Sequence, residues 1–450
     1  MDSILKEALD GIDADYADIR LERSESTSIS CMGPEFEHVG STFTLGGCVR
    51  ACVKGAWGFA AFNRIEDART SALEALFMAR IVGRGTTLLA PGRPVSAVLK
   101  SRASDPTGVP LEEKGGLVRR YNDIMLHAKE IVTTSTLYRD TKRTVWLLTS
   151  EGTCIERETV HAGVHLSAIA RDGANVQRGM RSFGDQRGYD TVLGREKDAE
   201  DAVKTARDLI SAPKVDGGVY RVVLNPQLAG VFAHEAFGHL SESDFVYENP
   251  KAGEMMKLGR RFGPDILNIV DDGSLDGENG YTPFDDEGAP AGRTSLIKNG
   301  ILVGRLHSRE TAGKMGEAPT GNARALNAGF RPLVRMTNTF IDRGDSPFES
   351  MLDEVGNGIY ACGFLGGNTD LERFTFSSAH AFRIEQGRIT TPVRDVILSG
   401  NVFDTLNRIS MIGDDLTLYG GLGGCGKGGQ MPLPVSDGSP HIFIDGVLVG

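Results

Sequence analysis

This chain of 450 residues lacks long hydrophobic runs and has no excess of basic residues. No apolar stretch reaches the roughly 18 residues that a membrane-spanning helix requires. Its 49 lysines and arginines are outnumbered by 60 aspartates and glutamates, and the net charge of −11 argues against general nucleic-acid binding. We therefore expect neither a membrane nor a nucleic acid among its partners.

Cysteine is scarce, and the N-terminal residues do not resemble a secretory signal. Met1 to Glu7 instead leads directly into an acidic amphipathic helix. We therefore expect a cytoplasmic location, where the six cysteines are reduced thiols rather than disulfides. The 57 glycines are dispersed, which is typical of a turn-rich β protein rather than of a low-complexity sequence.

The first half of the chain has an apparent internal duplication, at about residues 1–85 and 115–210. In the first copy the patterns predict a helix over 3–12, strands through 62 and a helix over 65–82. The second copy predicts a helix over 117–131, strands over 144–171 and a helix over 196–210. The repeated order predicts an N-terminal α+β domain over residues 1–212, built from two α+β layers packed together.

The stretch of residues 211–218, with its proline and glycines, marks the boundary to a second domain over 213–450. Asn299-Gly300 and Gln386-Gly387 each lie between two strand-like segments and predict hairpins. One helix is expected at about 402–410. The fold class is therefore α+β, with a mostly β C-terminal domain that carries the helix described next.

The most informative motif is His234-Glu235-Ala236-Phe237-Gly238-His239, which has the pattern HExxxH. It is one residue longer than the HExxH motif, whose histidines share one helix face and bind zinc. Residues five apart on a regular helix point about 140° apart, since each residue turns about 100°. Both rings can therefore meet one ion only if the helix bulges between them, as in a π-turn, and Gly238 tolerates such a distortion best.

The residues before this motif predict that it lies on a helix after a buried strand. Residues 219–224 are rich in β-branched side chains, Asn225 is a good N-cap, and Pro226 suits the first helical position. Apolar residues then follow at helical spacing. The competing interpretation is a core helix whose histidines only form local hydrogen bonds.

A catalytic zinc usually has three protein ligands and one open position, so a third ligand is needed. Cys425 is the best candidate, because its glycine-rich loop leaves the thiol unscreened and Lys427 would favour the thiolate. Cys48 and Cys52 lie in a strand-like segment and are better explained as packing residues. Residues 421–427 also match part of the P-loop pattern, but no Ser or Thr follows Lys427, which argues against nucleotide binding.

Three other groups of polar residues give weaker indications of a functional site. His161 and His165 would stand about 13 Å apart on one strand, so they cannot share a metal and are expected to face the surface or line a groove. The acidic clusters at 271–272 and 285–287 lack the spacing of a calcium loop. They are expected to anchor loops or an interface, and contact with a substrate cleft stays open.

Several motifs together resemble the TldD branch of the TldD/PmbA peptidases, over essentially the whole chain and most closely from about residue 219 onward. The matching segments are His234 to His239 with Glu242, residues 284–288, 320–322 and 335–339, and Cys425-Gly426-Lys427. The resemblance implies that His234, His239 and Cys425 bind Zn²⁺ and that Glu235 is the catalytic base. The PmbA (TldE) branch lacks the metal site, so this chain resembles the catalytic, TldD-type subunit.

The resemblance also implies the substrate and the assembly. We expect a zinc-dependent metalloprotease that hydrolyses unfolded peptides or flexible protein segments in an enclosed cleft. It is expected to form a dimer, either with a PmbA/TldE-like subunit or with itself. Two alternatives stay open: a zinc hydrolase of small amides, and a non-catalytic peptide-binding or regulatory module with a structural zinc.

Overall fold

The N-terminal half of this computed structural model, which describes residues 2–450, contains one large sheet. Its spatial order is β3-β2-β1-β5-β6-β4, and β7 pairs with β6. The strands are β1 Tyr16–Met32, β2 Glu35–Val53, β3 Ala56–Phe62, β4 Ser96–Leu99, β5 Ile131–Thr149, β6 Cys154–Asp172 and β7 Asn175–Asp185. Neighbours pair antiparallel except β4 and β6, which are parallel.

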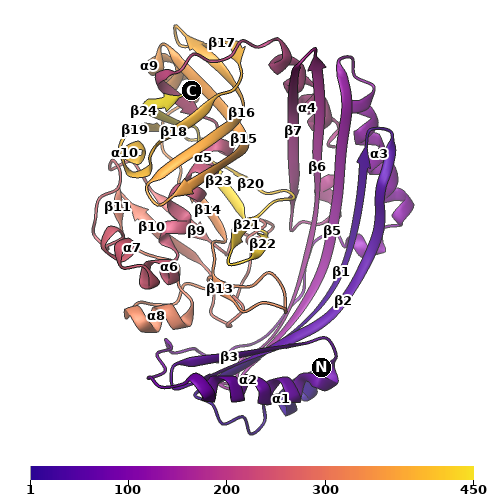
Figure 1. The fold of residues 1–450 in the computed structure, drawn as a ribbon, viewed down its shortest axis with the longest axis vertical. Helices are drawn as coiled ribbons and strands as arrows, with labels where there is room; N and C mark the ends of the chain where they lie inside the picture. The colour runs from indigo at the N-terminus through magenta and orange to yellow at the C-terminus, as the bar shows by residue number, and fades with distance from the viewer. Residues whose placement is uncertain (1) are drawn as a thin grey trace.

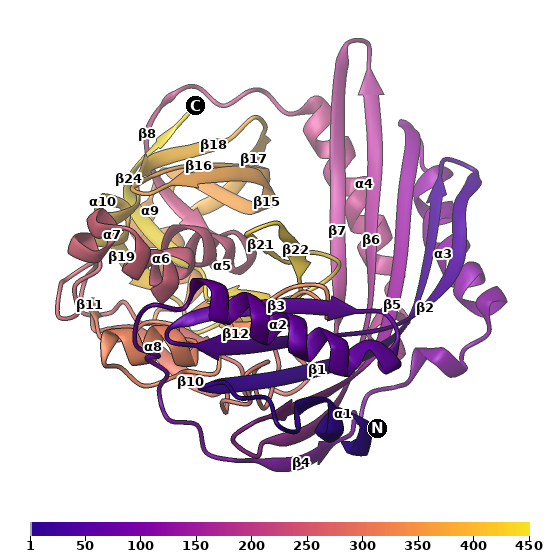
Figure 2. The ribbon, with the colours of Figure 1, turned by 60° about the horizontal axis from the view of Figure 1, so that its bottom comes forward.

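The helices of this half cover the outer face of the sheet, and the C-terminal half lies within its curve (Figure 1). They are α1 Asp2–Leu9, α2 Ala68–Val82, α3 Leu111–Leu126 and α4 Glu196–Ser211. Figure 2 shows α1 and α2 lying along β1 and β3 at one end of the sheet. Two apolar cores result, one under α1 and α2 and the other under α3 and α4.

Two helix–strands–helix units, α1-β1-β2-β3-α2 and α3-β5-β6-β7-α4, are joined through the antiparallel pair β1 and β5. One glycine in each unit makes the same contact. A Cβ on Gly58 of β3 would lie 1.8 Å from the carbonyl oxygen of Ala75 in α2. A Cβ on Gly179 of β7 would lie 1.8 Å from that of Ala202 in α4. The helix backbone therefore sits directly on the strand in both copies.

Two predictions for this half were wrong in detail. The two units do not pack as separate layers, because β1 and β5 pair from Asp18–Thr149 to Met32–Ser135 and make one continuous sheet. The helix expected over 117–131 spans Leu111–Leu126, and Ile131 already belongs to β5. Lys114, in the first turn of α3, is buried and pairs with Asp140 at 2.6 Å. This ion pair packs the first turn of the helix against the sheet, although that turn lacks the apolar spacing on which the prediction was based.

The C-terminal half is mostly β, as predicted, and contains two larger sheets. One has the order β11-β10-β9-β14-β23-β20. Its strands are β9 Ile269–Asp272, β10 Arg293–Lys298, β11 Ile301–Leu302, β14 Asn338–Ile341, β20 Thr417–Tyr419 and β23 Ser436–Ser439. The other has the order β15-β8-β24-β18-β16-β17, with β19 paired to β24. Its strands are β8 Gly218–Leu224, β15 Gly358–Asp370, β16 Arg373–Glu385, β17 Arg388–Val393, β18 Ile397–Asn401, β19 Ile409–Ile412 and β24 Ile442–Val449.

Two short hairpins and six helices complete this half. The hairpins are β12 Ala323–Arg324 with β13 Leu333–Val334, and β21 Cys425–Lys427 with β22 Gln430–Leu433. The helices are α5 Pro226–Ala233, α6 Ser243–Glu248, α7 Pro250–Met255, α8 Arg309–Met315, α9 Phe348–Val355 and α10 Val402–Asn407. Both predicted hairpin turns are confirmed, with positive φ at their Asn-Gly and Gln-Gly pairs.

Buried ion pairs join the two halves. Asp286 lies 3.0 Å from Arg20 of β1 and 3.1 Å from Arg157 of β6, while Glu287 lies 3.1 Å from Arg50 of β2. All five side chains are largely shielded from water, so removal of one partner would leave a buried charge uncompensated. The acidic cluster 285–287 is therefore an interface cluster, one of the two roles expected for it.

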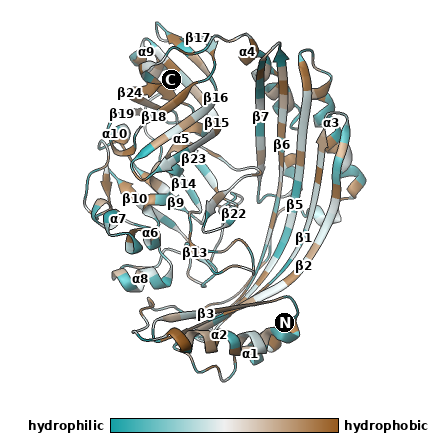
Figure 3. Cartoon of the chain, viewed as in Figure 1, coloured by the Kyte–Doolittle hydropathy of each residue, from teal (hydrophilic) through white to brown (hydrophobic). Residues whose placement is uncertain are grey.

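Hydrophobic and hydrophilic residues alternate along the long strands of the N-terminal sheet (Figure 3). One face of the sheet is covered by helices, and the other turns towards the C-terminal half (Figure 1). Among the helices of residues 2–450, none combines the length and hydropathy that a membrane span demands.

Candidate metal centre

The HExxxH motif lies where helix α5 changes into a π-turn. Asn225 caps the helix by accepting a hydrogen bond from the Leu228 backbone N–H, and Pro226 is the first helical residue, as predicted. Residues His234–Gly238 then form one π-helical turn, in which the backbone N–H of His239 donates to the carbonyl of His234. The predicted bulge is confirmed, and it brings the two imidazole centroids to 5.0 Å.

Gly238 is required for a different reason than the sequence suggested. Its backbone is ordinary right-handed helix, with φ −56° and ψ −52°. A Cβ at this position would lie 2.1 Å from the sulfur of Met336. The absence of a side chain therefore makes room for Met336 rather than for a strained backbone.

Three potential metal-binding groups meet at this turn. The ligand atoms of His234, His239 and Cys425 all lie within 4.8 Å of one another. The Sγ of Cys425 is 3.6 Å from Nε2 of His239, although the two residues are 186 positions apart in the chain. Within residues 2–450, no further histidine, cysteine or carboxylate joins the group. The structure thus brings together the three residues that the sequence singled out.

Each imidazole contacts a carboxylate through its Nδ1 atom. Nδ1 of His234 lies 2.7 Å from Oδ1 of Asp437 on β23, and Nδ1 of His239 lies 3.1 Å from Oε2 of Glu242. These contacts favour the tautomer in which Nε2 carries the free lone pair. Metal-binding histidines in proteins are commonly oriented in this way.

The three groups also stabilise one another's charged forms. Burial opposes charge on Cys425, but hydrogen bonds and charges from His234 and His239 lower the pKa of the thiol to about 6. Burial likewise lowers the pKa of His239, but Cys425 and Glu242 outweigh it and raise this pKa to about 9. The pKa of His234 is raised well above its usual value against the effect of burial, chiefly by Asp437. Once the two imidazoles lose their protons, the thiolate and two ring nitrogens form a ligand set that suits zinc.

The expectation that Lys427 favours the thiolate was wrong. The Lys427 ammonium pairs with Glu242 at 3.0 Å and with Asp244 at 2.6 Å. Its charge is therefore neutralised, and the histidines lower the pKa of Cys425 instead. Lys427 affects the site indirectly, because it pairs with Glu242, the carboxylate that orients His239.

The backbone around Cys425 is fixed from two sides. A Cβ on Gly424 would lie 2.3 Å from the carbonyl oxygen of Leu433, the strand partner of Cys425. On the other side, the fully buried Arg335 donates a hydrogen bond of 2.7 Å from Nη2 to the carbonyl of Cys425. Cys425 is only 2% exposed, so its thiol lies inside the protein. The sequence had instead suggested a thiol left unscreened in a loop.

The acidic residue Asp271 supports this arrangement. It accepts hydrogen bonds from Thr337, from Thr339 and from the side-chain amide of Asn322. Asn322 in turn donates to the carbonyl of Arg335. Asp271 is thus a loop anchor, which is the role expected for its cluster.

Glu235 lies inside the π-turn and is partly buried. Unlike the carboxylates around it, its side chain forms no hydrogen bond or ion pair within the described residues 2–450. A carboxylate that is not committed to another group is available to accept a proton.

The remaining candidates have other roles. Burial raises the pKa of Cys48, and it raises that of Cys362 to about 12, so neither thiol is prone to ionise. The glycine-rich loop continues into the hairpin β21–β22 and not into a helix, which excludes a P-loop. His161 lines a cavity described below, as expected for a groove-lining residue.

Sequence reasoning did not assign roles to Asp437, Glu242 or Arg335. Glu242 stands three residues after His239, so its spacing could have indicated the contact. Asp437 and Arg335 reach the site only through the packing of distant strands, and no local pattern indicates them.

Comparison with known proteins agrees with these observations. Residues 17–79, 104–212 and 217–450 match the models of domain 1, the central domain and the C-terminal domain of the PmbA/TldA metallopeptidases. A metalloprotease of Synechocystis sp. is 47% identical over 440 residues, which cover 97% of this chain and 95% of that protein. A zinc metalloprotease TldD homolog of Saccharolobus solfataricus is 37% identical over 53% of each chain. The crystal structure of TldE from Thermococcus kodakarensis has the same fold, with a TM-score of 0.79 and 19% identity over 100% of this chain and 99% of that one.

Proposed function

This chain belongs to the PmbA/TldA metallopeptidase family, and we propose that it is a zinc-dependent peptidase of the TldD type. It would hydrolyse unfolded peptides or flexible protein segments in a cleft between its two halves. The observation that carries the proposal is the meeting of His234, His239 and Cys425 within 4.8 Å. Their chemistry, two imidazole nitrogens and a stabilised thiolate, fits zinc.

The three residues would hold the metal, and the carboxylates of Asp437 and Glu242 would keep the two rings in position. When bound, zinc supplies a Lewis acid that polarises the scissile carbonyl and lowers the pKa of the attacking water. Structural zinc sites usually have four protein ligands, whereas this group has three within the described chain. The open position favours catalysis over a purely structural role.

Glu235 would be the general base. Its uncommitted carboxylate stands next to His234 in the π-turn, where it could accept a proton from the attacking water and pass it to the leaving amine. His234, His239 and Cys425 would take no part in proton transfer, because their donor atoms would be occupied by the metal.

An extended peptide would bind through its main chain. Strand addition at an open sheet edge satisfies the backbone groups of any sequence, which would give weak sequence preference. The hairpin β21–β22 carries Cys425 and pairs with neither of the larger sheets, so its edges are candidates.

Assembly as a dimer is part of the proposal. The similarity to a TldE structure supports pairing with a PmbA/TldE-like subunit, and self-association is the alternative. Among other activities, hydrolysis of small amides would use the same ligand set. A capped amino-acid amide that is cleaved as well as a long peptide would favour that alternative.

Replacement of Glu235 by glutamine tests the proposed function. An amide cannot accept the proton at neutral pH, so peptide cleavage should fall by about 10²–10⁴-fold while zinc stays bound. Elemental analysis measures the zinc, and mass spectrometry of incubated peptides measures cleavage. Glu248→Gln, an exposed glutamate of α6, is the matched control. Unchanged turnover in a zinc-loaded Glu235→Gln protein would remove this residue from the mechanism.

A further inference from the structure

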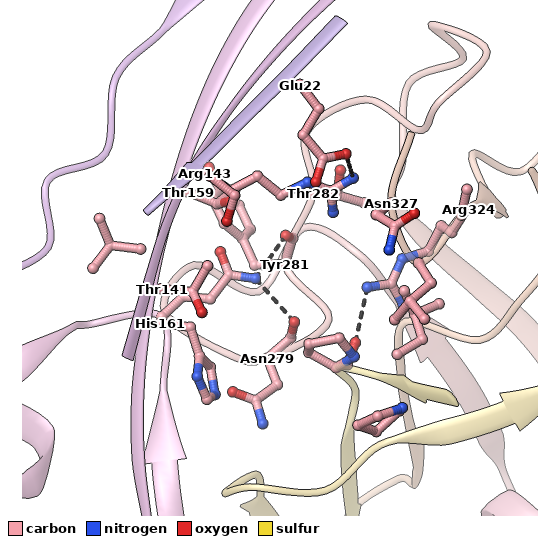
Figure 4. A pocket seen from close by; sticks show the side chains of 18 of the residues that line it. Glu22, Thr141, Arg143, Thr159, His161, Asn279, Tyr281, Thr282, Arg324 and Asn327 are labelled. Atoms are coloured by element: carbon pink, nitrogen blue, oxygen red, sulfur yellow. Dashed lines mark hydrogen bonds and ion pairs between the residues drawn. The ribbon is translucent and has the colours of Figure 1, made fainter. Parts of the chain in front are cut away.

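A cavity of about 430 Å³ lies between the N-terminal sheet and the loops of the C-terminal half (Figure 4). Residues 421–423 and Leu433 form part of its wall. Leu433 is the strand partner of Cys425, so the cavity adjoins the hairpin that carries the thiol. Its volume lies within the range of about 300–1,000 Å³ that is usual for ligand pockets.

The sheet wall of this cavity is polar, although it belongs to the inner face of a sheet. Thr44, Ser24, Arg143 and Thr159 are cross-strand neighbours in one row over β2, β1, β5 and β6, and all four line the cavity. Residues two positions apart on a strand share a face, so Arg139 continues the same wall. In Figure 4 the side chains of Arg143 and Thr159 come from the sheet, opposite Arg324 of β12.

The wall formed by the C-terminal half contains Arg324 of β12, a cation in an unusual environment. Its guanidinium donates hydrogen bonds to the main-chain carbonyls of Met336 and Pro434. Burial and the neighbouring Arg335 together lower the pKa of Arg324 to about 10. Asp286 and Asp271 oppose this shift through their charges, but no carboxylate within residues 2–450 forms a direct ion pair with Arg324. A shielded cation without a direct ion-pair partner is costly, and an anion in the cavity would offset that cost.

The other charges of the cavity leave an excess of positive charge. Four arginines and three carboxylates line it: Arg139, Arg143, Arg157, Arg324, Glu22, Asp285 and Asp286. Glu22 pairs with Arg143 at 2.6 Å, and Asp286 pairs with Arg157 at 3.1 Å.

The third carboxylate, Asp285, is also committed. It accepts backbone N–H groups from Glu287, Ala289 and Ala323. Arg139 and Arg324 are therefore the two cavity cations that the described chain leaves without a carboxylate partner.

We propose that this cavity binds a carboxylate of the peptide substrate through Arg139 and Arg324. The planar guanidinium group matches a carboxylate with two parallel hydrogen bonds, and such charged hydrogen bonds are stronger than neutral ones. The inference rests on the proposed peptidase function, because it assumes that a peptide extends from the hairpin into the cavity. The carboxylate is either an acidic side chain or the C-terminal carboxylate of the peptide.

Four synthetic peptides test this proposal and separate the two sources. They share one unstructured sequence, with either glutamate or glutamine at three positions, and each is made with a free or an amidated C-terminus. The zinc-loaded protein should favour the carboxylate that the cavity binds by about tenfold or more in kcat/KM. Preference for the glutamate pair identifies the side chain, and preference for the free C-terminus identifies the terminal carboxylate.

Arg139→Gln and Arg324→Gln should each bring the ratio of kcat/KM between the paired peptides closer to one, mainly by raising KM for the preferred peptide. Arg139 is exposed and forms no ion pair with any residue of 2–450, so its replacement keeps the test valid if Arg324→Gln fails to fold. Arg171→Gln removes an exposed arginine from β6 outside the cavity, and it should keep the full preference.

Two results distinguish failure of this inference from failure of the proposed function. Cleavage of all four peptides at equal rates, unchanged in both cavity variants, would overturn carboxylate binding and leave the peptidase intact. If no peptide is cleaved, fluorescence anisotropy with labelled peptides still measures binding. A charge-dependent affinity that is lost in Arg139→Gln would then support the cavity, and equal affinities would refute it.

Discussion

Replacement of Asp437 by asparagine should weaken zinc binding without removing a ligand. The 2.7 Å contact between Asp437 Oδ1 and Nδ1 of His234 orients the ring and makes its other nitrogen a better donor. Asparagine can still accept the hydrogen bond, but it has no negative charge. Loss of such a carboxylate typically costs about 10–100-fold in metal affinity. That range corresponds to about 1.4–2.8 kcal/mol. The His234 side chain is 4% exposed and that of Asp437 is 23% exposed, so solvent screens the pair only weakly.

Competition with a chromophoric chelator measures the zinc dissociation constant of the wild type and of Asp437→Asn. The chain contains a matched control, because Asp415 contacts Nδ1 of His441 at 2.5 Å outside the three-residue metal group. Asp415→Asn should leave zinc affinity unchanged. Thermal unfolding of the zinc-free proteins shows whether either variant loses stability. A dissociation constant within about twofold of the wild type for a folded Asp437→Asn protein would refute the assigned role.

Three further predictions concern the thiol and the assembly. Cys425→Ser should lose most of its zinc, since the hydroxyl is a poor ligand, whereas Cys362→Ser should keep full occupancy in elemental analysis. Equal occupancy in both variants would exclude Cys425 as a ligand. Gly424→Ala should displace the thiol, because its Cβ would meet the Leu433 carbonyl at 2.3 Å, while Gly426→Ala meets only the Met431 side chain at 3.3 Å. Zinc content should therefore fall in the first variant and change little in the second; the reverse order would contradict this geometry. Light scattering should find the active protein as a dimer, alone or with a PmbA/TldE-like chain, and a fully active monomer would contradict the proposed assembly.

Local patterns predicted the elements that carry the motif. Asn225 and Pro226 start a helix because a capping side chain and a fixed φ suit its first turn, whatever the rest of the chain does. The extra residue between His234 and His239 likewise predicted a π-turn from helix geometry alone. Such predictions succeed because each depends on neighbouring residues.

Details that depend on packing were missed or explained wrongly. Gly238 was attributed to backbone distortion, but the sulfur of Met336, nearly a hundred residues away, is what excludes a side chain there. Lys427 was expected to act on Cys425, but two carboxylates neutralise it. The number and sign of the charges around a residue depend on every element that packs against it. The spacing of residues along the chain therefore cannot predict them.

The sequence by itself determined the fold class, the helix–strands–helix order of the N-terminal half, the π-turn and the three candidate ligands, because these follow from periodicity, capping and the chemistry of side chains. Only the tertiary structure decided that Asp437 supports His234, that Arg335 fixes the backbone of Cys425, and that one sheet curves around a cavity lined by arginines. The physical reason is that a hydrogen bond requires atoms within about 3 Å and in the right direction. For residues about 90 to 200 positions apart, that closeness arises only when the strands that carry them have packed together.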